Sequence, residues 1–220
     1  MATPVRFFFE KGGPSKYMSH LDLTRCMTRC LRRSGLPVWY TEGYNQHVYM
    51  TFALPLSLGQ TGKYEIMDVK FVSDMKFSEA MEKLNACLPE GIKVWKVAAP
   101  EGKHTSIVSA DYEITLVCAQ FTAQELAEKL SAFIAQDEIL VEKRTKSKQI
   151  KEFDLKQHIK KSFIEAKEDV KLKLTLPAGC TENVNPSLLL DAFFEKEGVK
   201  PDVCAIVRTA VYNEKGKLFR

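Results

Sequence analysis

The sequence predicts an α+β protein made of two ferredoxin-like halves, each with the element order βαββαβ and an antiparallel sheet. Short apolar runs typical of strands alternate with amphipathic helical segments, and this order occurs twice along the chain. A segment rich in Pro, Gly and polar residues, AAPEGKHTS, separates the two copies. We therefore expect one domain at residues 1–99 and a second at 107–220.

The first half contains four predicted strands and two predicted helices. Ser19 is the expected N-cap of the first helix because Asp22 follows three residues later, and Gly35 ends this helix. The second helix is expected at 78–88, where apolar residues recur on one face before Pro89. Strands are predicted at Val5–Glu10, His47–Ala53, Tyr64–Phe71 and Ile92–Val97.

The second half repeats this order with its own helix signals. Thr122 and Glu125 form a capping box at the start of one helix. Asn185 and Pro186 begin the last helix, which Gly198 ends. Strands are predicted at Tyr112–Cys118, Glu138–Glu142, Val170–Leu176 and Cys204–Tyr212, with an additional one near Phe153–Ile159 inside a basic insertion at 143–161.

Composition excludes several classes of protein. With 220 residues, 45% of them hydrophobic, the chain can bury a normal core, and no stretch resembles a signal peptide or a membrane span. We expect a cytoplasmic protein with no membrane association. The six cysteines are scattered, and four of them fall within apolar patterns, so we interpret them as mostly reduced core residues. Cys26 and Cys30 lack further ligands nearby, so we expect no metal and no cofactor.

The predicted helix over 21–34 carries the strongest functional signal. Its apolar stripe, Leu23, Met27, Cys30 and Leu31, turns a row of arginines outward: Arg25, Arg29, Arg32 and Arg33. Three of these four arginines have no acid three or four residues away. Guanidinium groups bind phosphate oxygens in bidentate fashion, so the helix is suited to an anionic partner. A solvated helix face is the alternative interpretation.

Two further segments extend this basic surface. The insertion adds Lys143, Arg144, Lys146 and Lys148 as candidate phosphate contacts. The segment from Trp39 to His47 combines aromatic rings with amides, including Tyr44 and Asn45, which is the combination that single-stranded RNA recognition uses. Trp39 and Tyr40 are also compatible with an ordinary core role.

Four motifs in this half point to a known family: KYMSHLDLTR at 16–25, RRSGLP at 32–37, EGYNQH at 42–47 and FALPLSLG at 52–59. Together they resemble the radical SAM-linked protein family, a bacterial domain family of unknown function. The resemblance implies a context in which the protein is encoded beside, or fused to, a radical SAM enzyme, often near a ribonuclease that processes ribosomal RNA. This chain lacks the CxxxCxxC motif, so cluster chemistry would belong to the partner.

Three functions remain open at this point, and whether the protein is an enzyme is one of the open questions. The first is an accessory RNA-binding module, for ribosomal RNA or tRNA, that acts with a radical SAM RNA-modifying enzyme. The second is a metal-independent RNA-processing or RNA-modifying enzyme with His20 and His47 as acid and base. The third is a protein–protein adaptor.

A candidate site follows from the same residues. We expect four residues to support the substrate site: Ser19, Asp22, Tyr44 and Asn45. We predict that His20, Asp22, Arg25, Asn45 and His47 line one solvent-open cleft, with Arg29 or Arg32 at its rim.

Overall fold

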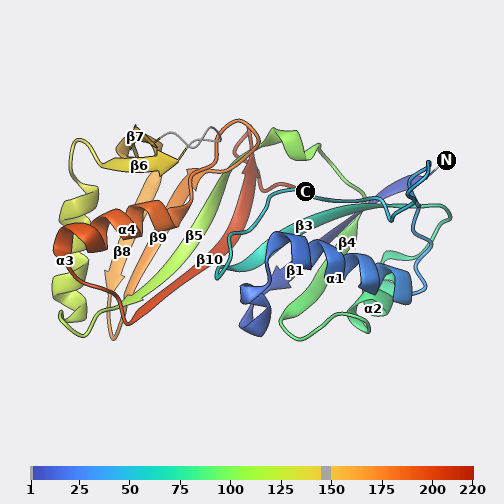
Figure 1. Cartoon of the computed structure of the whole chain (residues 1–220), viewed down its shortest axis with the longest axis horizontal. Coiled ribbons are helices and arrows are strands. Elements are labelled where there is room, and N and C mark those ends of the chain that lie inside the picture. Colours follow the sequence, from blue (N-terminus) through green and yellow to red (C-terminus); the bar gives the residue numbers. More distant parts are fainter. Residues whose placement is uncertain (1, 145–149) are drawn as a thin grey trace. The chain divides into compact units, whose positions relative to one another are not determined.

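The computed structural model describes residues 2–144 and 150–220. The fold is α+β, as predicted, and the described residues form four α-helices with mostly antiparallel strands (Figure 1). The chain divides into two compact units, Met1–Ile107 with Asn213–Arg220, and Val108–Tyr212. In the part of the chain that the structure describes, every helix is too short or too polar to cross a membrane.

The first unit follows the order βαββαβ. Its sheet has the strand order β4-β1-β3-β2, and β1 lies between β3 and β4 in antiparallel pairing. The elements are β1 (Thr3–Lys11), α1 (His20–Arg33), β2 (Met50–Phe52), β3 (Thr61–Phe71), α2 (Phe77–Asn85) and β4 (Ile92–Ala98), with a short 3-10 helix, η1 (Gly13–Tyr17), before α1.

The core of this unit lies between the sheet and its two helices, which cover one face of the sheet (Figure 1). Alternate residues of β1 point into the core, which is why Phe7 and Phe9 are fully buried there. The helices contribute Leu23, Met27 and Leu84 to the same cluster. Burial of this apolar face is the main force that holds α1 on the sheet.

The first unit also buries a charged side chain of β1, Arg6. Its guanidinium donates to both oxygens of Asp68 at 2.7 and 2.6 Å, and to the carbonyl oxygens of Arg220 at 2.6 Å and Gly102 at 2.9 Å. The Phe219 ring lies 4.5 Å from the guanidinium carbon. The 213–220 segment therefore packs on the first unit through Arg6, although it is far from that residue in sequence.

The second unit contains four neighbouring strands of a sheet and a separate two-stranded hairpin. The sheet has the order β10-β5-β9-β8, and the hairpin pairs β6 with β7. The elements are β5 (Ile107–Val117), α3 (Ala123–Ile134), β6 (Leu140–Arg144), β7 (Ile150–Asp154), β8 (Lys161–Ala166), β9 (Val170–Pro177), α4 (Pro186–Glu197) and β10 (Val203–Asn213). If the hairpin is set aside, the succession is again βαββαβ.

The predicted helix signals are confirmed at atomic detail. The capping box of Thr122 and Glu125 opens α3, and the Asn185 side chain caps α4, which ends at Gly198 with a φ of 67°. Because each of these interactions spans only a few residues, the local sequence is sufficient to specify it.

Several predicted boundaries are wrong. The strand expected at 47–53 is limited to 50–52, and α2 ends at Asn85 rather than near 88. In the basic insertion, the additional strand lies at 150–154 instead of 153–159, and β8 at 161–166 was not predicted. β8 is a terminal strand of its sheet, and none of its residues is fully buried, so it lacks a strong apolar alternation.

Candidate nucleic-acid interface

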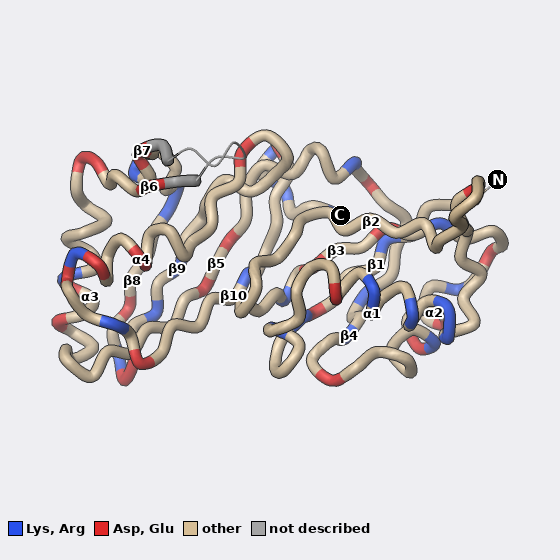
Figure 2. The backbone as a smooth tube through the Cα atoms, viewed as in Figure 1, with Lys and Arg blue, Asp and Glu red and all other residues tan. Residues whose placement is uncertain are grey.

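The α1 helix presents its arginines to solvent because its opposite face is buried. Ser19 caps the helix by accepting a hydrogen bond from the backbone N–H of Asp22 at 3.2 Å, as predicted. The predicted stripe of Leu23, Met27, Cys30 and Leu31 is buried, which confirms the orientation of the helix. Figure 2 shows basic positions along α1, all of which are arginines. All four arginines of the row are exposed: Arg25, Arg29, Arg32 and Arg33.

A hollow of about 410 Å³ lies on this face, lined by Asp22, Arg25, Cys26, Arg29 and Arg33. Three guanidinium groups and one carboxylate leave two unbalanced positive charges within it. Arg25 lies 3.4 Å from the Asp22 carboxylate, an exposed pair of the kind that contributes little to stability. For Arg29, the structure of the described residues shows no hydrogen bond or ion pair. The hollow is therefore a local excess of positive charge with room for an anion.

This part of α1 also contacts the segment that follows α2. The Arg33 side chain donates to the carbonyl oxygen of Cys87 at 3.4 Å, and the Cys30 thiol donates to the same oxygen at 3.0 Å. Burial raises the pKa of the Cys26 thiol to about 11, and the adjacent Cys30 adds to this, whereas Arg33 and Arg29 oppose it. The thiol is therefore neutral at pH 7 and does not cancel the positive charge of the arginines.

This pKa shift has a measurable consequence for Cys26. Only the thiolate reacts with iodoacetamide, so we expect alkylation of Cys26 at pH 8 to be at least about tenfold slower than alkylation of the exposed Cys180. The rate at Cys26 should rise as the pH approaches 11, and the two rates should converge in urea, where burial is lost. Peptide mapping by mass spectrometry measures both sites in one sample. Equal rates in the folded protein would contradict the shift.

The segment after α1 forms a hairpin arm, residues 38–50. The Tyr49 backbone N–H donates to the Trp39 carbonyl at 3.0 Å, and the Thr41 N–H donates to the His47 carbonyl at 2.8 Å. Tyr40 and Val48 form an antiparallel bridge between these two bonds. Residues 42–47 are exposed, so the arm carries its polar tip away from the core.

Aromatic rings on the arm contact two cations. Trp39 and Tyr49 pack together at 5.6 Å between ring centroids, and the Lys70 ammonium lies 4.9 and 4.4 Å from these rings. The Arg32 guanidinium lies 5.8 Å from the ring of Tyr40, which links the arm to the arginines of α1. Tyr49 and Lys70 were not predicted as site residues, because their proximity to Trp39 arises from pairing with β3.

Tyr44 lies at the tip of the arm and is fully exposed, with a relative exposure of 108%. Large aromatic side chains are normally at least partly buried, since their apolar area is what stabilises a fold. Gly43 precedes it with a φ of 117°, a conformation that glycine adopts without strain. The exposed ring has no packing role in the described structure and is available to a partner.

The structure places the two histidines in different surroundings. The His20 ring, at the first position of α1, packs edge-on against Phe52 at 5.3 Å. The His47 ring nitrogen Nδ1 lies 3.1 Å from the Thr41 hydroxyl and 3.1 Å from the Asn45 carbonyl. Of the five residues predicted to share one cleft, Asp22 and Arg25 line the hollow of α1, whereas His20, Asn45 and His47 are not among its lining residues.

The basic insertion belongs to the second unit. Lys143 and Arg144 lie in β6, at the end of the hairpin with β7. Lys146 and Lys148 lie outside the described residues. Whether this segment contributes to the same surface as α1 stays a prediction.

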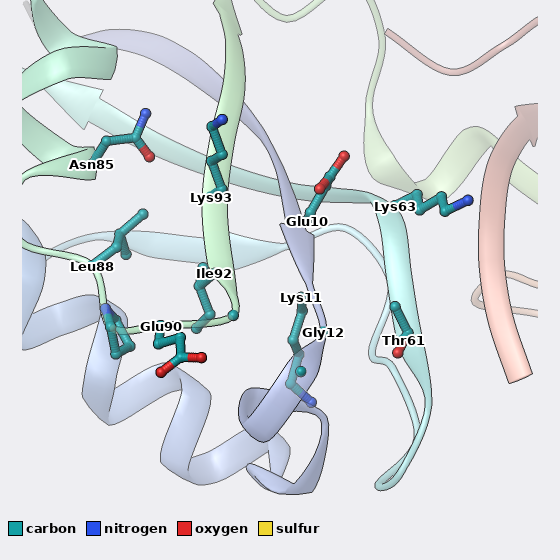
Figure 3. Close-up of a pocket in the computed structure, with 13 residues that line it drawn as sticks. Glu10, Lys11, Gly12, Thr61, Lys63, Asn85, Leu88, Glu90, Ile92 and Lys93 are labelled. Carbon is teal, nitrogen blue, oxygen red and sulfur yellow. The ribbon is translucent and has the colours of Figure 1, made fainter. Parts of the chain in front are cut away.

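A second hollow in the first unit, of about 640 Å³, lies at the ends of β1, β3 and β4 (Figure 3). Its charged lining residues have both signs: Glu10, Glu90, Lys11, Lys63 and Lys93. Two of the three lysines are offset by glutamates, and the buried Lys11 donates to the Met18 carbonyl at 2.8 Å. The charge excess of the α1 hollow is therefore not repeated here.

Among the described residues, no three His, Cys, Asp or Glu side chains are grouped so that they could hold a metal ion. The site is instead defined by arginines, aromatic rings and amides on one helix and one hairpin arm. This combination is typical of proteins that bind anionic polymers.

Comparison with known proteins places the chain in a family. It belongs to a family of uncharacterized proteins conserved in bacteria, DUF2344, which matches residues 5–186. The match confirms the resemblance to a bacterial family of unknown function. No curated protein matches the chain.

Proposed function

We propose that this protein is an accessory RNA-binding module that acts in the cytoplasm with a radical SAM RNA-modifying enzyme. The observation that carries the RNA-binding part is the arginine-lined hollow of α1, where three guanidinium groups face one carboxylate. Arginine is the side chain best suited to phosphate because its planar group offers paired donors.

The hairpin arm supports the same function. Phosphate contacts position an RNA chain, and aromatic rings hold its unpaired bases. Tyr40 lies beside Arg32, so one aromatic ring is adjacent to the cationic row, and a second ring, Tyr44, is exposed at the tip of the arm. The strand order β4-β1-β3-β2 further supports our proposal that the first unit is ferredoxin-like, a fold that recurs among RNA-binding domains.

The radical SAM partner and the choice of ribosomal RNA or tRNA rest on the motifs from residue 16 to residue 59 and on the context that their resemblance implies. The chain itself lacks the cysteine motif for a radical SAM cluster, so any such chemistry belongs to the partner. Co-purification of the native complex, with sequencing of bound RNA, tests partner and substrate together. Recovery of the protein without a radical SAM enzyme would contradict the proposed partnership.

RNA binding is tested with the variant Arg25→Ala. We expect the affinity for a labelled single-stranded RNA to fall by about fivefold, because one charge-assisted phosphate contact is lost. The slope of log K against log salt should become less steep by about 0.7, the value for one phosphate on a single strand. Fluorescence anisotropy at several salt concentrations measures both quantities.

Lys217→Ala provides the matched control, because Lys217 is an exposed cation of the 213–220 segment and lies outside the α1 surface. This variant should leave both affinity and slope unchanged. Binding that does not depend on salt, or an equal loss in both variants, would favour a protein adaptor instead. If the wild-type protein cleaves the RNA and His20→Ala abolishes this cleavage, the protein is an enzyme rather than a binding module.

A further inference from the structure

The α1 hollow contains more positive charge than one internal phosphate of an RNA chain can balance. A phosphodiester carries one negative charge, whereas the hollow has an excess of two positive charges. A phosphate at the end of a chain is a monoester, which carries about −1.5 to −2 charges at pH 7 and has three strong acceptor oxygens. A terminal phosphate therefore matches the hollow in charge.

The arrangement of the arginines favours a single anion over a row of separate ones. Arg25, Arg29 and Arg33 follow one another at intervals of four residues, each about 6 Å further along the helix axis. Their side chains nevertheless line one hollow with Cys26, and do not spread into separate sites. Long flexible arginine side chains can converge in this way on a compact ligand with several acceptors.

The two outer arginines are each restrained by a protein contact. Arg25 is paired with Asp22 at 3.4 Å, and Arg33 donates to the Cys87 carbonyl at 3.4 Å. Arg29 lies between them, and no hydrogen bond or ion pair of its side chain is found in the described structure. Its guanidinium is thus available for a bidentate contact in the middle of the hollow.

We propose that this hollow binds the terminal phosphomonoester of an RNA chain, with Arg29 as the central contact. The inference rests on the RNA binding proposed above and specifies which part of the RNA is recognised. Arg32 follows Arg29 by three residues and reaches the Tyr40 ring, so the nucleotide that carries the phosphate has a cationic and aromatic surface beside it.

The test uses the full chain and one short single-stranded RNA sequence, labelled internally, in three forms: with a 5′-phosphate, with a 3′-phosphate, and with hydroxyls at both ends. We expect one phosphorylated form to bind about tenfold more tightly than the hydroxyl form, as one added charge-assisted contact would produce. The phosphorylated form with the higher affinity identifies which end of the RNA the protein recognises. Arg29→Gln should abolish the preference.

Arg32→Gln is the matched control, since it removes the same charge from the same helix outside the lining of the hollow. This variant should weaken the binding of all three RNAs alike and retain the preference for the phosphorylated form. Equal affinity of the wild-type protein for the three forms would overturn the inference while leaving RNA binding intact. Loss of the preference in both variants would also overturn it, because general charge would then explain the effect. Absence of binding to every form would instead reject the RNA-binding function itself.

Discussion

Replacement of Arg6 by methionine is expected to lower the free energy of unfolding by about 3–5 kcal/mol, the usual cost of removing one partner from a buried ion pair. Arg6 is 1% exposed and makes two hydrogen bonds to Asp68. Its loss leaves that carboxylate without its guanidinium, and removes the donors to the carbonyl oxygens of Gly102 and Arg220. Urea unfolding monitored by circular dichroism measures the change.

A double-mutant cycle with Asp68→Asn distinguishes this cause from simple loss of packing. In the Asp68→Asn background, Arg6→Met should lower the free energy of unfolding by clearly less than it does in the wild-type protein. The reason is that residue 68 is already neutral, so the substitution leaves no carboxylate without its partner. Additive effects of the two substitutions would show that the ion pair contributes little. Methionine retains much of the length of arginine, so a cavity is not the expected source of the loss.

Substitution of Gly91 by alanine is expected to destabilise the protein by about 3 kcal/mol, through backbone strain and overpacking together. Gly91 has a φ of 83°, and a Cβ atom there would collide with the carbonyl oxygen of Gly12. The two glycines are joined by a hydrogen bond of 2.7 Å from the Gly12 N–H to the Gly91 carbonyl. The turn before β4 can move away only by breaking this contact with the end of β1.

Gly216→Ala separates the two contributions. Gly216 has a similar φ of 68°, but no atom lies within 4 Å of the position that a Cβ would occupy. Alanine there should cost only the conformational strain, about 1 kcal/mol. Comparison of the two midpoints of thermal unfolding therefore isolates the collision at Gly91, and equal shifts would contradict it.

The candidate site combines a rigid element with an exposed one. The α1 helix is held by its buried stripe and its cap, so the positions of its arginines are set by the core. The base of the hairpin arm is held by backbone bonds, by the packing of Trp39 and Tyr49 around Lys70, and by the Arg32–Tyr40 contact, whereas its tip is exposed. In the proposed function, the helix would bind phosphate in a defined place, while the tip could adapt to different bases.

The local features of this protein were predictable from sequence because each depends on residues a few positions apart. The caps at Ser19, Thr122 and Asn185 are hydrogen bonds to residues two or three positions away. The buried stripe of α1 follows from the helical period, and exposure of the arginines follows from the stripe. The α+β class follows from the order of these elements.

The tertiary structure alone decided the features that join distant residues. Arg6 and Asp68 are 62 positions apart, and the contact of Arg6 with Arg220 spans 214 positions. No pattern in the sequence indicated that the 213–220 segment returns to the first unit, or that Lys70 meets Trp39 and Tyr49. Such pairings depend on strand register and on which face each side chain occupies, and a shift of one residue would reverse both. For this reason the sequence alone determined the row of arginines on α1, whereas folding determined that three of them line one hollow over Cys26 and that the fourth reaches Tyr40.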